Sequence, residues 1–252
     1  MISLKSKNWV LNNIETIIFD KDGTFIDLHY FWGKMTEMRV REIVSRYDLE
    51  DTVFNLLCLK LGYDPESKKM LSDGITALYS RSKIIEIFVE DLKEIGLNLT
   101  FYDLEGLFDD VANDFYKDLL DFVKPIEEAI DFIKKVKKMG LRTGIVTADS
   151  LDSTNLILNN FGWKDLFDVV IGRESSSYTK ESGIPLKMAI DELNANPDNT
   201  IMIGDAPTDA IAAKNAGVKK SILVATGQVK FEDLLKNTNY VVNSLSEILT
   251  LC

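Results

Sequence analysis

The chain has 252 residues, of which 46% are hydrophobic and 27% charged, and a formal net charge of −11 at pH 7; this length allows an α/β core with a modest second module. The negative charge argues against a nucleic-acid partner, because binding to a phosphate backbone needs a positive surface. No run of about 18 apolar residues occurs, and residues 1–13 lack the apolar block of a secretory signal, so we expect no membrane partner and a cytoplasmic protein.

The first predicted element is a buried strand that ends at Asp20. Residues 16–19 read Thr-Ile-Ile-Phe, which are apolar and partly β-branched. Asp20 and Asp22 follow, and two carboxylates this close repel each other unless a cation lies between them or one carries a proton. One could then be a nucleophile and the other an acid. An aspartate turn that only ends the strand is the structural alternative.

Residues 26–122 carry helical patterns and no convincing strand. Helices are expected at 33–47, 50–61, 83–95 and 101–122. We interpret this stretch as an inserted all-helical cap domain, with the core formed by residues 1–25 and 123–252. Ligands of open α/β sheets bind beyond the carboxyl ends of the strands, so we expect the cap to lie there.

From residue 123 onward, strand and helix patterns alternate. Strands are expected at 143–147, 167–171, 200–204, 221–225 and 240–242, and helices at 125–140, 151–161, 186–193 and 209–216. Such alternation predicts an α/β fold with a doubly wound parallel sheet and helices on both of its faces.

A second acidic pair, Asp205 and Asp209, follows the strand predicted at 200–204. Clusters of carboxylates without histidine or cysteine suit Mg²⁺ better than zinc, and the only histidine of the chain is His29. A helix start that carries aspartates because the helix dipole favours them is the structural alternative.

Two further polar residues occupy comparable positions. Thr147 ends a predicted strand, where its hydroxyl and the following backbone N–H groups could bind phosphate; an ordinary N-cap threonine is the alternative. Lys180 precedes the helix that leads into the 200–204 strand, and taken alone it would be an ordinary surface lysine.

Together, these four segments resemble the motifs of the haloacid dehalogenase superfamily of phosphohydrolases. Residues 17–24 (IIFDKDGT) match its first motif, 145–147 the second, Lys180 the third and 203–209 (IGDAPTD) the fourth. A cap between the first and second motifs resembles the phosphoglycolate phosphatase-like branch. The resemblance implies a Rossmann-like core and an enzyme that hydrolyses phosphate esters.

The resemblance also implies catalytic roles. Asp20 would attack phosphorus and become an aspartyl-phosphate, and Asp22 would protonate the leaving group and then activate water. A second aspartate favours a phosphate ester, because the dehalogenases of this superfamily, whose halide leaving group needs no proton, lack it.

For substrate binding, the resemblance implies that Thr147, Ala148 and Lys180 hold the phosphoryl oxygens. Ala148 departs from the asparagine often found there, so only its backbone N–H could contribute. Lys180 lacks the prolines that usually follow this lysine, which leaves Lys187 as a fallback.

For the metal, the resemblance implies Mg²⁺ bound by Asp20, by Asp22 through its main-chain carbonyl, and by Asp205. Asp209 would orient Lys180 or a metal-bound water. The resulting interpretation is a Mg²⁺-dependent phosphomonoester hydrolase for a small phosphate ester. A sugar phosphomutase with the same nucleophile and a non-catalytic phosphate-binding regulatory protein remain as alternatives.

Overall fold

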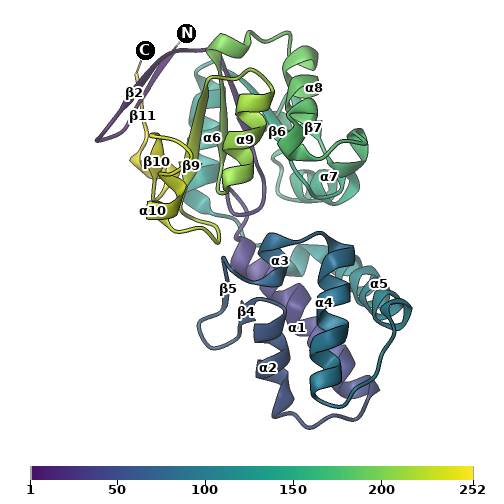
Figure 1. The fold of residues 1–252 in the computed structure, drawn as a ribbon. Helices are drawn as coiled ribbons and strands as arrows, with labels where there is room; N and C mark the ends of the chain where they lie inside the picture. The colour runs from purple at the N-terminus through teal and green to yellow at the C-terminus, as the bar shows by residue number, and fades with distance from the viewer. Residues whose placement is uncertain (1, 252) are drawn as a thin grey trace. The chain divides into compact units, whose positions relative to one another are not determined.

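The computed structural model describes residues 2–251, and the chain divides into two compact units (Figure 1). The first unit combines the residues up to Asp27 with those from Pro125 onward. The second unit is Leu28–Lys124, so it is an insertion between two parts of the first. Among the described residues, the helices are too short or too polar to cross a bilayer.

A six-stranded sheet forms the centre of the first unit. Its strands are β3 (Thr16–Phe19), β6 (Arg142–Val146), β7 (Val169–Ile171), β8 (Thr200–Gly204), β9 (Lys220–Val224) and β10 (Val241–Val242). The spatial order is β10-β9-β8-β3-β6-β7, and all neighbours pair in parallel. All four residues of β3 are buried, since this strand lies between β6 and β8. The predicted α/β fold is confirmed.

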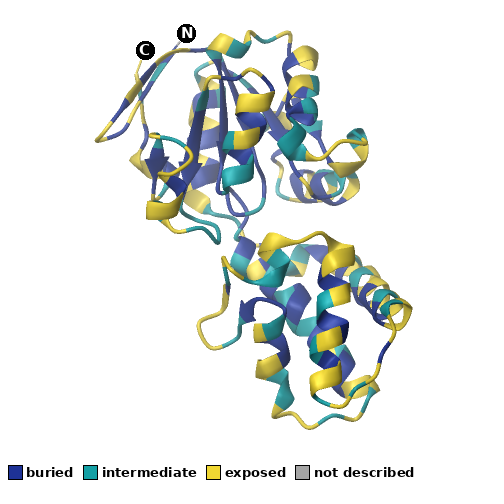
Figure 2. Ribbon diagram, viewed as in Figure 1, coloured by how far each residue is buried: buried dark blue, intermediate teal, exposed yellow. Residues whose placement is uncertain are grey.

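Helices cover both faces of this sheet. They are α6 (Glu127–Lys138), α7 (Leu151–Asn160), α8 (Ile184–Glu192), α9 (Pro207–Asn215) and the short α10 (Phe231–Leu234). Ile18 joins the core cluster that contains residues of α8 and α9, whereas the ring of Phe19 meets that of Phe132 in α6 edge-on, with centroids 6.4 Å apart. Adjacent strand residues point to opposite faces, so each face has its own buried core, the dark blue interior of Figure 2.

A small antiparallel sheet was not predicted from the sequence. It consists of β1 (Ile2–Lys5), β2 (Val10–Ile14) and β11 (Leu249–Leu251), in the order β11-β1-β2. β1 pairs with both the next strand along the chain and the last one. Strands of three to five residues with mixed polarity give a weak local signal, and pairing between chain ends leaves no local signal at all.

The second unit is a helical bundle around buried phenylalanines. It contains α1 (Leu28–Arg46), α2 (Val53–Lys60), α3 (Ile75–Leu78), α4 (Arg81–Glu94) and α5 (Phe101–Lys117). Helix α5 begins with a capping box, in which Thr100 Oγ1 accepts from Asp103 N at 3.2 Å and the Asp103 carboxylate accepts from Thr100 N at 2.9 Å. The rings of Phe88 and Phe108 are fully buried between α4 and α5.

This unit also differs from the prediction of helices alone. A two-stranded hairpin, β4 (Tyr63–Asp64) with β5 (Lys69–Met70), interrupts the helices. The Asp64 carboxylate accepts from Glu66 N at 3.0 Å and from the Ser67 hydroxyl at 2.6 Å, which forms the turn. Two-residue strands are too short to show a period-2 pattern. The only local indication of this hairpin in the sequence was therefore the aspartate of its turn, Asp64.

Candidate active site

The predicted site residues follow strands that end at one edge of the parallel sheet. Asp20 comes directly after β3, Thr147 after β6 and Asp205 after β8. Carboxyl ends of parallel strands share one edge, where open α/β sheets bind their ligands. Side chains that are far apart in the sequence therefore meet here.

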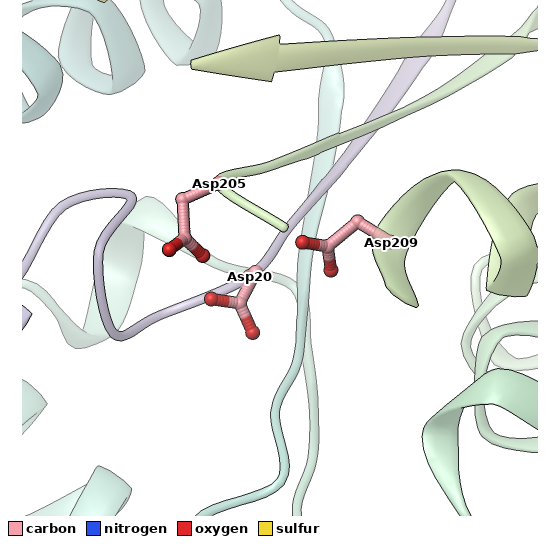
Figure 3. Close-up of side chains that lie close together, drawn as sticks. All are labelled: Asp20, Asp205 and Asp209. Carbon is pink, nitrogen blue, oxygen red and sulfur yellow. The ribbon is translucent and has the colours of Figure 1, made fainter. Parts of the chain in front are cut away.

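Three aspartates form a buried cluster at this edge, which we call the acidic trio: Asp20, Asp205 and Asp209. One oxygen from each lies within 4.8 Å of the others, and Figure 3 shows the three carboxylates turned toward one another from the ends of β3 and β8 and from the start of α9. Oxygen donors alone, without nitrogen or sulfur, suit a hard cation such as Mg²⁺.

The electrostatics of the trio also favour a cation. Burial raises the pKa of Asp20 to about 7; the positive charge of Lys180 opposes this rise, and the negative charge of Asp209 adds to it. Burial, followed by repulsion from Asp20 and Asp209, raises the pKa of Asp205 well above its ordinary value. Carboxylates in such a place are costly to ionise unless a positive charge joins them.

Lys180 provides one such charge. Its Nζ lies 2.6 Å from Asp209 Oδ1 and also contacts Asp20 Oδ1, and only 8% of its side chain is exposed. The turn that carries it is fixed to the end of α9, because Asn215 Nδ2 donates to Glu181 O at 2.7 Å. This bond connects the turn of Lys180 to the helix that carries Asp209. Lys187 is exposed on α8.

Two glycines make room for Asp205. A Cβ on Gly23, whose φ is +82°, would lie 2.5 Å from Asp205 Cγ, and a Cβ on Gly227 would lie 2.6 Å from the same atom. The loop of Gly227 is held to the first motif, because the Thr226 hydroxyl donates to Gly23 O at 2.5 Å. Sequence reasoning missed Thr226 and Gly227, although a Thr-Gly pair after the strand predicted at 221–225 was the available signal.

Thr147 and its neighbours line the end of β6. Thr147 is buried and its Oγ1 accepts from Asp149 N at 3.1 Å, so its hydroxyl hydrogen is available to another acceptor. Ala148 is exposed. The loop therefore offers one hydroxyl and a small side chain near the sheet edge.

A second charged group, also missed by sequence reasoning, lies beside the first motif. Lys21 is fully buried, with its Nζ 2.5 Å from Asp22 Oδ1 and 3.0 Å from Asp149 Oδ2. Burial alone would lower the pKa of Lys21, but the charges of Asp22 and Asp149 outweigh it and raise this pKa above its ordinary value. The available signal was a lysine inside the first motif, directly after a buried strand. Lysines are almost never fully buried unless they are paired with a counterion.

This fold and this cluster define a class of α/β enzymes, in which aspartates and a lysine meet at the carboxyl edge of a parallel sheet. Residues 14–217 match the family model of haloacid dehalogenase-like hydrolases, and the chain belongs to that family. The family predicted from the four motifs is thus confirmed.

Relatives of the expected branch are among the matches. A phosphoglycolate phosphatase of Psychrobacter arcticus is 28% identical over 208 residues, which cover 81% of this chain and 80% of the relative. A pyrophosphatase PpaX of Halalkalibacterium halodurans is 30% identical over 129 residues, 50% of this chain and 59% of that protein, so this match spans little more than half of the relative.

Solved structures show the same fold. The crystal structure of a predicted phosphoglycolate phosphatase from Haemophilus somnus superposes with a TM-score of 0.71 at 16% identity, covering 94% of this chain and 97% of the other. A haloacid dehalogenase-like hydrolase from Bacteroides fragilis gives a TM-score of 0.67 at 20% identity, covering 93% and 99%.

Proposed function

We propose that the chain is a Mg²⁺-dependent phosphomonoester hydrolase that acts on a small phosphate ester through an aspartyl-phosphate on Asp20. The observation that carries this proposal is the position of Asp20, directly after the central strand, where its carboxylate lies beside those of Asp205 and Asp209 and contacts the ammonium of Lys180. The printed names of relatives, a phosphoglycolate phosphatase and a pyrophosphatase, support a phosphoryl compound as the substrate class. We propose the helical insertion as the cap that selects among such compounds.

In the first step, an Asp20 oxygen attacks phosphorus and the bond from phosphorus to the ester oxygen breaks. The departing alkoxide takes a proton from the Asp22 carboxyl, so an alcohol leaves. Lys180 and the Thr147 hydroxyl bind phosphoryl oxygens. Their role is large, because two unit charges of like sign about 4 Å apart repel by about 4 kcal/mol at an effective dielectric near 20.

In the second step, the Asp22 carboxylate accepts a proton from water. The water oxygen attacks phosphorus and the bond to Asp20 breaks, which releases inorganic phosphate and restores both carboxyl groups to their starting states. Because Asp22 is the acid in one step and the base in the other, one residue serves both proton transfers.

The residues of the acidic trio fit a divalent cation. Asp20 and Asp205 would hold Mg²⁺ with the main-chain carbonyl of Asp22, while Asp209 stays in its ion pair with Lys180. When bound, Mg²⁺ would neutralise charge on the phosphoryl group. The supporting observations are the all-oxygen donor set and the raised pKa values of Asp20 and Asp205, whose causes are burial and, after it, repulsion from neighbouring carboxylates.

The test is a panel of phosphomonoesters, with pyrophosphate included, incubated with Mg²⁺ and assayed for inorganic phosphate. The proposal expects phosphate release that EDTA abolishes and added Mg²⁺ restores. Isomerised sugar phosphate without free phosphate would indicate the phosphomutase instead. Binding of phosphate compounds with no turnover in any reaction would indicate the regulatory protein, and activity that ignores EDTA would refute the metal's role.

A further inference from the structure

We infer that Lys21 and Asp149 form a buried ion pair whose role is to position the Asp22 carboxyl for proton transfer to the leaving group. This inference rests on the proposed function, in which Asp22 is the acid. Lys21 and Asp149 are then positioning residues, since they act through Asp22 and not on the substrate.

The first support is the geometry around the ammonium. Lys21 Nζ is enclosed and contacts Asp22 Oδ1 at 2.5 Å and Asp149 Oδ2 at 3.0 Å. Asp22 keeps 13% of its side chain exposed, whereas Asp149 keeps 2%. Asp149 is therefore the buried counterion of Lys21. The Asp22 carboxyl, which a ligand can reach, is held on one side by the same Lys21 ammonium.

The second support is that both ends of this contact are fixed in place. The carbonyl of Lys21 accepts hydrogen bonds from Thr24 N, Phe25 N and Ile26 N at 3.1–3.2 Å, which winds the loop around it. These bonds fix the backbone from which the Lys21 side chain extends.

Asp149 is fixed in the same way. It accepts from Ser150 N at 2.7 Å and from the Ser153 hydroxyl at 2.9 Å, and its own N–H donates to Thr147 Oγ1 at 3.1 Å. The loop that binds the phosphoryl group is thus joined to the acid through Thr147, Asp149 and Lys21. Catalytic groups need placement to within about 0.5 Å, which such locked supports provide.

The third support is energetic. Burying an ammonium costs several kcal/mol, and apolar side chains of similar volume often replace a buried ion pair with no loss of stability. Packing alone would therefore not require Lys21 between two aspartates. A positioning role accounts for the pair, because an apolar side chain could not hold the Asp22 carboxyl.

The test compares leaving groups. An alkyl phosphate needs its oxygen protonated as it leaves, whereas a nitrophenyl phosphate leaves readily without an acid. The double variant Lys21→Met/Asp149→Asn removes the pair without changing net charge, and Asp149→Asn alone is the milder second variant. Asp168→Asn is the matched control, because its ion pair with Lys137, at 2.5 Å, lies at the amino end of β7.

We expect the double variant to lose about 10- to 100-fold in kcat/KM for the alkyl ester and less than about threefold for the nitrophenyl ester. Asp149→Asn should show the same bias to a smaller degree, and Asp168→Asn none. Equal losses for both esters, or no loss, in a folded variant would overturn the inference. If the double variant does not fold, equal losses in Asp149→Asn overturn it instead. A wild-type protein inactive on every ester would refute the proposed function itself.

Discussion

Replacing Gly227 by alanine tests how closely the loop after β9 approaches the acidic trio. A Cβ at this position would lie 2.6 Å from Asp205 Cγ and 2.9 Å from Asp205 Cβ, and nearer still to Oδ2. Separations below 3.0 Å force a shift, so the Asp205 carboxyl and the loop of Gly227 have to separate by at least 0.4 Å at Cγ and by more at Oδ2. Metal–ligand distances tolerate changes of only about 0.2 Å.

The variant should therefore bind Mg²⁺ about 10- to 100-fold more weakly, the range seen when a supporting group of a metal site is lost. The assay is a Mg²⁺ titration of phosphate release, paired with calorimetric titration of Mg²⁺ into the protein. Gly106→Ala is the control, since a Cβ there meets nothing within 4 Å. A Gly227→Ala protein with the wild-type Mg²⁺ response would refute this reasoning.

Three further predictions concern single groups. Asp22→Asn should slow both leaving-group departure and phospho-enzyme breakdown, by about 10²- to 10⁴-fold; rapid-quench kinetics would measure both, and wild-type rates would contradict the role. In EDTA, the free energy of unfolding should fall as pH rises from 3.8 to about 7. Burial raises the pKa of Asp20 from 3.8 to about 7, so the folded state binds more protons than the unfolded state in this window. Urea unfolding at several pH values would test this, and a free energy of unfolding that rises throughout would count against it. Phe108→Ala should lower the free energy of unfolding by about 3–5 kcal/mol, because the ring is fully buried; a loss below about 1 kcal/mol by the same method would show that it is not a core residue.

The main sheet could be predicted because its signal is local. The run 200–204 is apolar and β-branched, and β8 has these bounds. Helix α6 has its apolar positions on one buried face, and Gly140, with φ +84°, follows its end. For elements of this kind, the hydrophobic periodicity and the residues that end the element both lie within one stretch of sequence.

Features that depend on distant partners could not be predicted. β11 exists because it pairs with β1, whose residues lie at the other end of the chain. The environment of Lys21 depends on Asp149, which the fold brings to it from the loop after β6. The sequence shows Lys21 between the two aspartates of the first motif, but its counterion became visible only in the folded chain.

The same division applies to the site. Asp20, Asp205, Asp209 and Lys180 were expected together because their segments resemble the four motifs of the family in their order along the chain, and the structure brings all four together at one sheet edge. Their chemical roles stay predictions, because the geometry of acids and an ammonium fixes proximity but not the order of bond formation.

The covalent step on Asp20 is the central claim, and mass spectrometry of quenched reactions tests it most directly. After brief incubation with a substrate from the panel, the peptide that contains Asp20 should gain the mass of one phosphoryl group. With a nitrophenyl ester, whose departure needs no acid, this adduct should accumulate in Asp22→Asn. It should be absent in Asp20→Asn, which should also release no phosphate. Phosphate release by Asp20→Asn at the wild-type rate, or a phosphoryl group on another residue, would contradict the account.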